Sequence, residues 1–160
     1  MNLVESASKK NLHIAVAESL TAGLVSAQLA ETPGASKVLL GGVVAYQDQV
    51  KSSILSVDSS LIQAQTAVDA DVAMQMALGV RRQFATICGA DTATVVGVST
   101  TGVAGPDPVG AISPGIVFIG ISSARGERNV ALQLQGDRSE IRSSAVTAAL
   151  QALREEIQLL

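Results

Sequence analysis

Nucleophilic catalysis is the chemistry open to Ser36, Tyr46 and Lys51, which are spaced ten and then five residues apart. A serine hydroxyl becomes a nucleophile only when a neighbouring base accepts its proton. The single histidine, His13, is predicted at the far end of the first strand, so the remaining base is a lysine amine that has lost its proton through desolvation or a cationic neighbour. Tyr46 could relay the proton or orient the amine. On spacing alone, a solvated surface lysine is the simpler interpretation of Lys51.

Two segments rich in hydroxyls and glycines could bind an anion. Glu18–Gly23 follows the first predicted strand and opens a helix, whose amides and hydroxyls could hold a phosphate; the simpler alternative is that Ser19 caps that helix. Thr101–Pro106 could form a nest of backbone amides for an anion or oxyanion, or only a glycine turn. The candidate binding residues in these segments are Glu18, Ser19, Thr21, Gly23, Thr101, Gly102 and Gly105.

A pair of arginines provides another candidate anion site. Arg138 and Arg142 lie one helical turn apart at the predicted start of the last helix. Two guanidinium groups on one helix face suit a phosphate or a carboxylate. An ordinary solvated helix face is an equally good interpretation.

Composition and the missing motifs exclude several function classes. No Gly-Lys-Ser/Thr loop and no Gly-x-Gly-x-x-Gly fingerprint is present, which disfavours ATP or NAD chemistry. One cysteine, Cys88, and one histidine, His13, leave no disulfide, no Cys-rich zinc site and no His pair, so we expect neither a metal nor a cofactor. A net charge of -3 argues against nucleic acid, and no apolar run is long enough for a membrane span. We expect a soluble, cytoplasmic protein.

The pattern of apolar residues predicts how these side chains are positioned. Strands alternate with helices before a hairpin and a closing helix, which predicts an α/β fold, a three-layer α/β/α sandwich on a mostly parallel sheet. In such a sheet ligands bind at the carboxyl ends of the strands. Asp69 is the predicted N-cap of one helix, and Asp137 with Glu140 forms a predicted capping box. The predicted strands cover 13–17, 41–46, 94–98, 115–122 and 129–134, and the helices 20–31, 70–86 and 137–157, after a short helix or loose entry over 1–11.

These motifs in this order resemble the CinA C-terminal domain family, the nicotinamide-nucleotide amidohydrolases. The resemblance covers nearly the whole chain, from about Val4 to Leu153. Each motif is weak by itself, whereas the ordered set is specific. The motifs are Ala17-Glu18-Ser19-Leu20-Thr21-Ala22-Gly23, Pro33-Gly34-Ala35-Ser36, Gly41-Gly42-Val43-Val44-Ala45-Tyr46 with Lys51, Thr101-Gly102-Val103-Ala104-Gly105-Pro106 and Gly136-Asp137-Arg138.

The resemblance implies a metal-free serine amidohydrolase that converts nicotinamide mononucleotide to nicotinate mononucleotide and ammonia. By matching motif, Ser36 would be the nucleophile, Lys51 the general base and Tyr46 the assisting hydroxyl. It also implies an anticodon-binding-like, five-stranded mixed sheet with one antiparallel strand, and a single, stand-alone domain over 1–160. The substrate phosphate would be held by Ser19, Thr21 and the helix start or by the two arginines, a choice that the sequence leaves open.

Two other functions remain open at this point. The same anion-binding loops could serve a non-catalytic nucleotide-binding module, or an amidase for another small amide. A nucleic-acid factor, which the family's historical name suggests, is disfavoured by the net charge of -3. Because the chain combines a mean hydropathy of +0.38 with only 16% charged residues, we expect a homo-oligomer.

Overall fold

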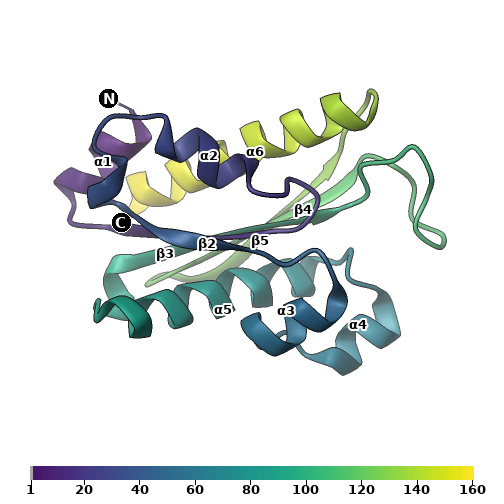
Figure 1. The fold of residues 1–160 in the computed structure, drawn as a ribbon, viewed down its shortest axis with the longest axis horizontal. Helices are drawn as coiled ribbons and strands as arrows, with labels where there is room; N and C mark the ends of the chain where they lie inside the picture. Colours follow the sequence, from purple (N-terminus) through teal and green to yellow (C-terminus); the bar gives the residue numbers. More distant parts are fainter. Residues whose placement is uncertain (1) are drawn as a thin grey trace.

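A five-stranded mixed sheet organises the structure, a computed structural model that describes residues 2–160 (Figure 1). The strand order is β2-β1-β3-β4-β5, with β1 parallel to β2 and β3 and with β4 antiparallel to both β3 and β5. One strand, β4, therefore runs against the other four, which confirms the predicted fold class. The strands are β1 (His13–Glu18), β2 (Leu39–Val44), β3 (Val95–Gly102), β4 (Ile116–Ser123) and β5 (Gly126–Gln133).

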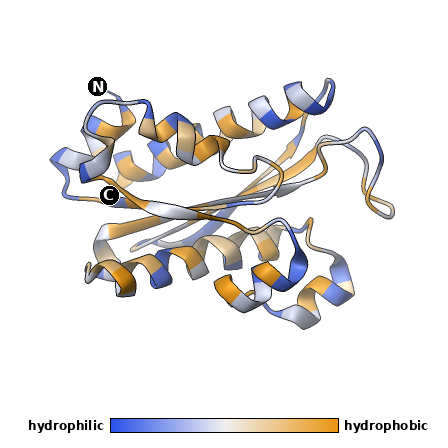
Figure 2. Ribbon diagram, in the orientation of Figure 1, coloured by the Kyte–Doolittle hydropathy of each residue, from blue (hydrophilic) through white to orange (hydrophobic). Residues whose placement is uncertain are grey.

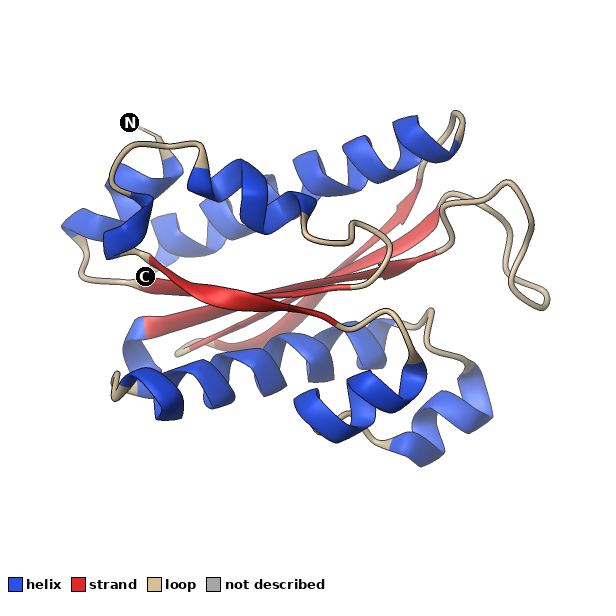
Figure 3. Cartoon of the chain, viewed as in Figure 1, coloured by secondary structure: helices blue, strands red, loops and turns tan. Residues whose placement is uncertain are grey.

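Helices cover both faces of the sheet and complete the three layers (Figures 1 and 3). One face carries α1 (Leu3–Lys9), α2 (Leu24–Ala30) and α6 (Arg138–Leu159). The other carries α3 (Asp48–Leu55), α4 (Ser59–Gln65) and α5 (Ala70–Cys88). Among residues 2–160, no helix is both long enough and apolar enough to cross a bilayer.

Each face of the sheet has its own apolar core. Ile14 and Val16 of β1 point into the core under α1, α2 and α6, while Ala15 and Ala17 point into the core under α5. Figure 2 shows apolar residues along the strands and apolar alternating with polar residues along the helices. Alternate residues of this one strand thus contribute to both cores.

Close packing of α5 on the sheet depends on glycine. A Cβ atom on Gly97 of β3 or on Gly120 of β4 would collide with the carbonyl oxygens of Ala77 and Ala73 in α5. Because glycine has no side chain at these two positions, the helix backbone lies directly against the strands. This close packing positions β3 relative to α5. One of the candidate binding segments follows the carboxyl end of β3.

The sequence predicted the starts of α5 and α6 correctly but not the start of α2. The Asp69 carboxylate accepts the amides of Asp71 and Val72, and Asp137 forms the predicted capping box with Glu140. The predicted helix over 20–31 is wrong at its start, and α2 begins only at Leu24.

Two features explain most of the remaining differences. Ala22 and Gly23 have φ angles of 51° and 98°, which turn the chain before α2 can begin. No helix or strand was predicted between residues 46 and 70, but this segment folds into the short helices α3 and α4. The observed strand ends differ from the predicted ones by one to four residues in β2, β3 and β5. Met1 of the predicted N-terminal segment lies outside the described residues.

Candidate active site

A cavity of about 460 Å³ opens at the carboxyl ends of β1 and β3, where the parallel part of the sheet predicts a ligand site. Its walls come from the segment after β1, the start of α3, the α4–α5 connection, the segment after β3 and the start of α6. These elements are far apart in the sequence and meet only through the sheet. The sequence-predicted residues that line it, here called the cavity cluster, are Ser19, Tyr46, Lys51, Thr101, Gly102, Gly105 and Arg138.

Lys51 is buried in the wall of this cavity. It lies in the first half of α3 and is 2% exposed, so the interpretation as a solvated surface lysine is wrong. Its Nζ atom donates to the backbone oxygen of Tyr46 and to Oδ1 of Asp48, both at 3.2 Å. These contacts hold the amine in the cavity wall rather than in solvent. In this position it can act as the base for a nucleophile that lines the same cavity.

Arg138 joins two walls of the cavity at its rim. It is the first residue of α6 and directly follows Asp137, the N-cap residue of the capping box. Its guanidinium donates to the Gly105 carbonyl oxygen at 2.7 Å and to the Tyr46 hydroxyl at 3.1 Å. A fixed cation at the rim is well placed to meet an anionic part of a ligand.

Ser19 supplies a hydroxyl that is open to the cavity. Its backbone amide donates to the Thr100 carbonyl oxygen at 3.0 Å, which ties the residue to β3. Within residues 2–160, no protein atom forms a hydrogen bond with the Ser19 hydroxyl, whereas the Thr101 hydroxyl donates to the Ala67 carbonyl oxygen at 2.6 Å. Of these two side chains, Ser19 is therefore the one available to a ligand.

The buried carboxylate of Glu18 builds the turn that presents Ser19. It accepts hydrogen bonds from the amides of Gly23, Val25 and Ser26 and from the Ser26 hydroxyl, at 2.8 to 3.0 Å. The N-terminus of α2 is thus already neutralised by an anion of the protein itself. The amides that were expected to hold a phosphate at this helix start already bond to Glu18, and the N-cap of α2 is Gly23 rather than Ser19.

Three other predicted binding residues also build this turn and do not line the cavity. The hydroxyl of Thr21 is buried against the Thr100 hydroxyl at 2.8 Å, and the amide of Gly23 is taken by Glu18. Arg142 donates to the carbonyl oxygens of Leu20 and Thr21. The predicted arginine pair is therefore divided, with Arg142 structural and Arg138 at the cavity.

Ser36 lies away from the cavity cluster. It is exposed in the short 3₁₀ turn Ala35–Lys37 that precedes β2, whereas Tyr46 follows β2. At about 3.3 Å per residue, the six-residue strand separates these two ends by roughly 20 Å. A serine and a lysine at opposite ends of one strand cannot share a proton. The structure therefore does not assemble Ser36 with Tyr46 and Lys51 within one chain. His13 begins β1 at this same remote end.

Sequence reasoning missed part of the cavity wall. Asp48 lines the cavity beside Lys51, and Ile62 and Val68 supply apolar lining from the segment between α3 and α5. The one available signal was Asp48 itself, an acidic residue at the start of an unrecognised helix. Among residues 2–160, no group of three His, Cys, Asp or Glu side chains gathers as a metal site.

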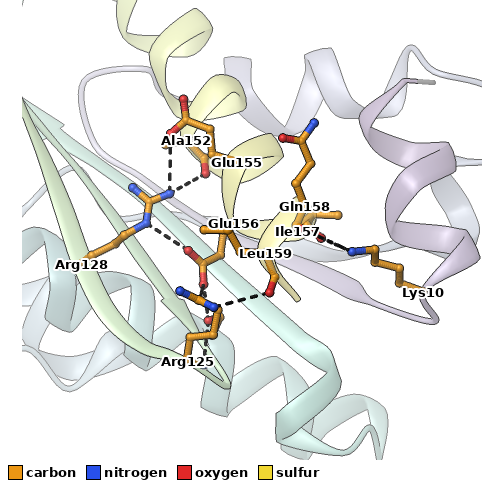
Figure 4. Close-up of polar contacts among 10 residues, drawn as sticks. Lys10, Arg125, Arg128, Ala152, Glu155, Glu156, Ile157, Gln158 and Leu159 are labelled. Carbon is orange, nitrogen blue, oxygen red and sulfur yellow. Dashed lines mark hydrogen bonds and ion pairs between the residues drawn. The ribbon is translucent and has the colours of Figure 1, made fainter.

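A second polar cluster, here called the hairpin cluster, lies at the amino ends of the parallel strands and consists of Ser123, Arg125, Arg128 and Glu156. Figure 4 shows the last three of these residues. Glu156 is 3% exposed; it accepts from the Ser123 hydroxyl and from Arg128 Nε at 3.0 Å, with Arg125 Nε 3.7 Å away. Burial alone would raise the pKa of Glu156, but the hydrogen bonds from Ser123 and Arg128 and the two arginine charges hold it below 4.5.

Comparison with known proteins identifies the family. A family model described as the CinA C-terminal domain matches residues 1–157. The chain belongs to the CinA C-terminal domain family. A putative competence-damage inducible protein of Desulforamulus reducens is 42% identical over 147 residues, which cover 92% of this chain and 34% of that protein. A CinA-like protein of Dictyoglomus thermophilum is 40% identical over 153 residues, which cover 95% of this chain and 35% of that protein. This CinA C-terminal domain thus spans about a third of the length of these relatives.

Solved structures of the CinA superfamily share the fold. A competence-damaged protein superfamily member from Escherichia coli superposes with a TM-score of 0.84 at 28% identity, covering 99% of this chain and 88% of that chain. Competence damage-inducible protein A from Klebsiella pneumoniae gives a TM-score of 0.83 at 23% identity, covering 99% and 98%. The second likeness concerns the fold alone.

Proposed function

We propose that this CinA C-terminal domain hydrolyses the carboxamide of nicotinamide mononucleotide to give nicotinate mononucleotide and ammonia. The observation that carries the proposal is a buried lysine and an unengaged serine hydroxyl, Lys51 and Ser19, in the wall of one cavity. Amide hydrolysis needs a nucleophile, a base that later returns the proton, and donors for the oxyanion. The cavity offers a candidate for each of these roles.

Ser19 takes the place of Ser36 as the nucleophile in this proposal. Its Oγ attacks the carboxamide carbon while Lys51 Nζ, in its neutral form, accepts the hydroxyl proton. Collapse of the tetrahedral intermediate breaks the C–N bond, and the lysine ammonium protonates the departing nitrogen, which leaves as ammonia. Water, activated by the same amine, then hydrolyses the acyl-serine ester and releases the nicotinate product.

The segment after β3 is the proposed oxyanion site. Ala104 and Gly105 line the cavity, and within residues 2–160 their backbone amides donate to no protein acceptor. Two such amides are suited to a negative oxygen that forms only during the reaction. Arg138, fixed at the rim by its bonds to Tyr46 and Gly105, would meet the substrate phosphate.

Ammonia release from nicotinamide mononucleotide tests this function. We expect release by the wild-type chain, loss in Lys51→Met, and no effect of EDTA, because every proposed role falls to a side chain or a backbone amide. If the folded wild-type chain releases no ammonia, titration calorimetry with the mononucleotide distinguishes the two alternative functions. Binding without release would indicate a nucleotide-binding module, and no binding would direct the search to other small amides.

A further inference from the structure

One carboxylate that lines the cavity, that of Asp107, has no partner in the protein. The other acidic side chain of the cavity wall, Asp48, is paired with Lys51 Nζ at 3.2 Å. Within residues 2–160, every acidic side chain except those of Asp71 and Asp107 accepts a hydrogen bond or pairs with a cation. Asp71 lies in the first turn of α5 and does not line the cavity. The cavity therefore has one uncommitted carboxylate, at Asp107.

The residues beside Asp107 explain why its carboxylate has no local partner. An aspartate in a turn commonly accepts a hydrogen bond from the backbone amide two residues further along. Here that amide, of Val109, donates instead to the Ile112 carbonyl oxygen at 3.0 Å. The two neighbours, Pro106 and Pro108, have no amide hydrogen to donate. The sequence Pro-Asp-Pro thus leaves the carboxylate available to a ligand.

The connection between β3 and β4 holds Asp107 in place. Figure 1 shows this connection extending beyond the end of the sheet. On the far side of Asp107, Val109 and Ile112 bridge to each other through two backbone hydrogen bonds. On the near side, Arg138 donates to the Gly105 carbonyl oxygen at 2.7 Å. A residue that precedes a proline is also restricted to extended backbone. Asp107 therefore has little conformational freedom to lose when a ligand binds.

The order of groups in the proposed substrate assigns a ligand to this carboxylate. In nicotinamide mononucleotide the ribose joins the pyridinium ring to the phosphate. With the carboxamide at Ser19 and Lys51 and the phosphate at Arg138, the ribose crosses the space between them. Asp107 lines this space and follows Gly105, the residue held by Arg138, by two positions. A carboxylate only accepts hydrogen bonds, through two oxygens, and the ribose diol offers two hydroxyl donors.

We propose that Asp107 accepts hydrogen bonds from the ribose hydroxyls of the substrate and so selects ribonucleotides. This inference rests on the proposed function, from which it takes the substrate and the position of the phosphate. An acidic residue bonds a ribose hydroxyl in the same way in dinucleotide-binding folds. The contact favours a nucleotide over a free amide, because nicotinamide by itself has no diol.

A pair of substrates that differ by one hydroxyl tests this contact. The kcat/KM for ammonia release is measured with nicotinamide mononucleotide and with its 2′-deoxy analogue. We expect the wild-type chain to prefer the ribonucleotide by about tenfold or more, since the analogue lacks a hydrogen bond to a charged acceptor. Asp107→Ala removes both acceptor oxygens and should bring the two values to within about twofold, chiefly by raising KM for the ribonucleotide.

Asp71→Ala is the matched control, because it removes the other exposed and unpartnered carboxylate. It should keep the wild-type preference. A wild-type chain without the preference, or an Asp107→Ala variant that retains it, would overturn the assignment and leave the proposed function standing. An equal loss for both substrates in Asp107→Ala would overturn it as well, because the carboxylate would then act on the pyridinium charge that both substrates carry.

Binding of the product separates failure of this contact from failure of the proposed reaction. Nicotinate mononucleotide carries the same ribose and phosphate and is not consumed. Titration calorimetry therefore gives its Kd, and that of its 2′-deoxy analogue, whether or not ammonia is released. A ribose preference that Asp107→Ala removes, without ammonia release by the wild-type chain, would support the contact and reject the reaction. A folded wild-type chain that binds neither nucleotide would reject both.

Discussion

The cavity cluster and the hairpin cluster contain the same kinds of side chain at opposite ends of the sheet, yet only one has the properties of an active site. Each contains a serine and at least one arginine. The buried titratable side chain beside them is Lys51 in the cavity cluster and Glu156 in the hairpin cluster. In the hairpin cluster both carboxylate oxygens of Glu156 accept hydrogen bonds, one from Ser123 and the other from Arg128. The polar groups of this cluster bond to one another, so we interpret the cluster as stabilising the fold rather than as reactive.

The cavity cluster leaves groups unengaged beside open volume. The Ser19 hydroxyl has no protein partner within residues 2–160, and about 460 Å³ of space adjoins the buried Lys51. An unengaged polar group costs free energy unless a ligand or water pairs with it. The comparison shows that residue type does not distinguish a site from a structural cluster, whereas unsatisfied groups facing a cavity do. We therefore expect changes in the cavity cluster to affect turnover and changes in the hairpin cluster to affect stability.

Replacement of the cavity lysine should have the largest effect. Lys51→Met is expected to lower kcat for ammonia release by about 10² to 10⁴-fold, the range typical of a lost acid–base group. The folded state should be retained, because methionine fills the space of the lysine stem. Ammonia release and thermal unfolding measure the two effects. A variant with kcat near the wild-type value would show that the cavity lysine is not the base.

Removal of the buried carboxylate should have the opposite profile. Glu156→Ala leaves Arg128 and Ser123 without their acceptor, so we expect the free energy of unfolding to fall by about 3–5 kcal/mol. Once the variant is folded, kcat should be unchanged. Glu155→Ala is the matched control, because the neighbouring carboxylate is 51% exposed and 4.0 Å from Arg128, and such surface pairs contribute about 1 kcal/mol or less. Equal losses in the two variants would contradict the distinction between the buried and exposed pairs.

Acid titration sharpens the same comparison. Because the pKa of Glu156 in the folded state lies below its ordinary value of 4.5, the folded protein binds that proton less readily than the unfolded chain. The stabilisation from Glu156 is therefore complete above about pH 4.5 and is lost as the pH falls through the lower, folded-state pKa. The difference in Tm between wild type and Glu156→Gln should be constant near neutrality and shrink in acid. A difference that grows in acid would have the wrong sign.

The smallest effect is expected at the rim of the cavity. Tyr46→Phe removes the hydroxyl that accepts from Arg138 but leaves the bond from Arg138 to Gly105. Loss of one hydrogen bond of about 0.5–1.5 kcal/mol should raise KM or lower kcat by about two- to tenfold. Steady-state kinetics check this range. A loss as large as that of Lys51→Met would assign the tyrosine a direct role in proton transfer.

Local patterns predicted the fold more fully than the site. The β-branched strands, the Asp69 cap and the Asp137 capping box are signals within a few residues, and the structure confirms each of them. The two cores follow from alternation along β1, as at Ile14 and Ala15. These elements are determined by neighbours in sequence, which is why a single chain sufficed to predict them.

The site depends on contacts between distant segments, which the sequence does not display. Ser36 matches a family motif, but only the direction of β2 shows that it lies at the far end from Lys51. Glu18 was a candidate ligand residue, but only the turn at Ala22 and Gly23 brings the α2 amides onto its carboxylate. Burial of Lys51 required α3, a helix of eight residues with a weakly apolar face. Long-range geometry therefore decided which predicted residues share the cavity.

One kinetic comparison tests the central claim that the active site is the cavity at the carboxyl ends of the strands. Ammonia release from nicotinamide mononucleotide is measured for the wild-type chain, for Ser19→Ala in the cavity, and for Ser36→Ala at the other end of β2. Both variants remove only a hydroxyl, so each serves as the matched control of the other. We predict that Ser19→Ala abolishes release and that Ser36→Ala retains most of it. Full activity in Ser19→Ala, with loss in Ser36→Ala, would contradict the account.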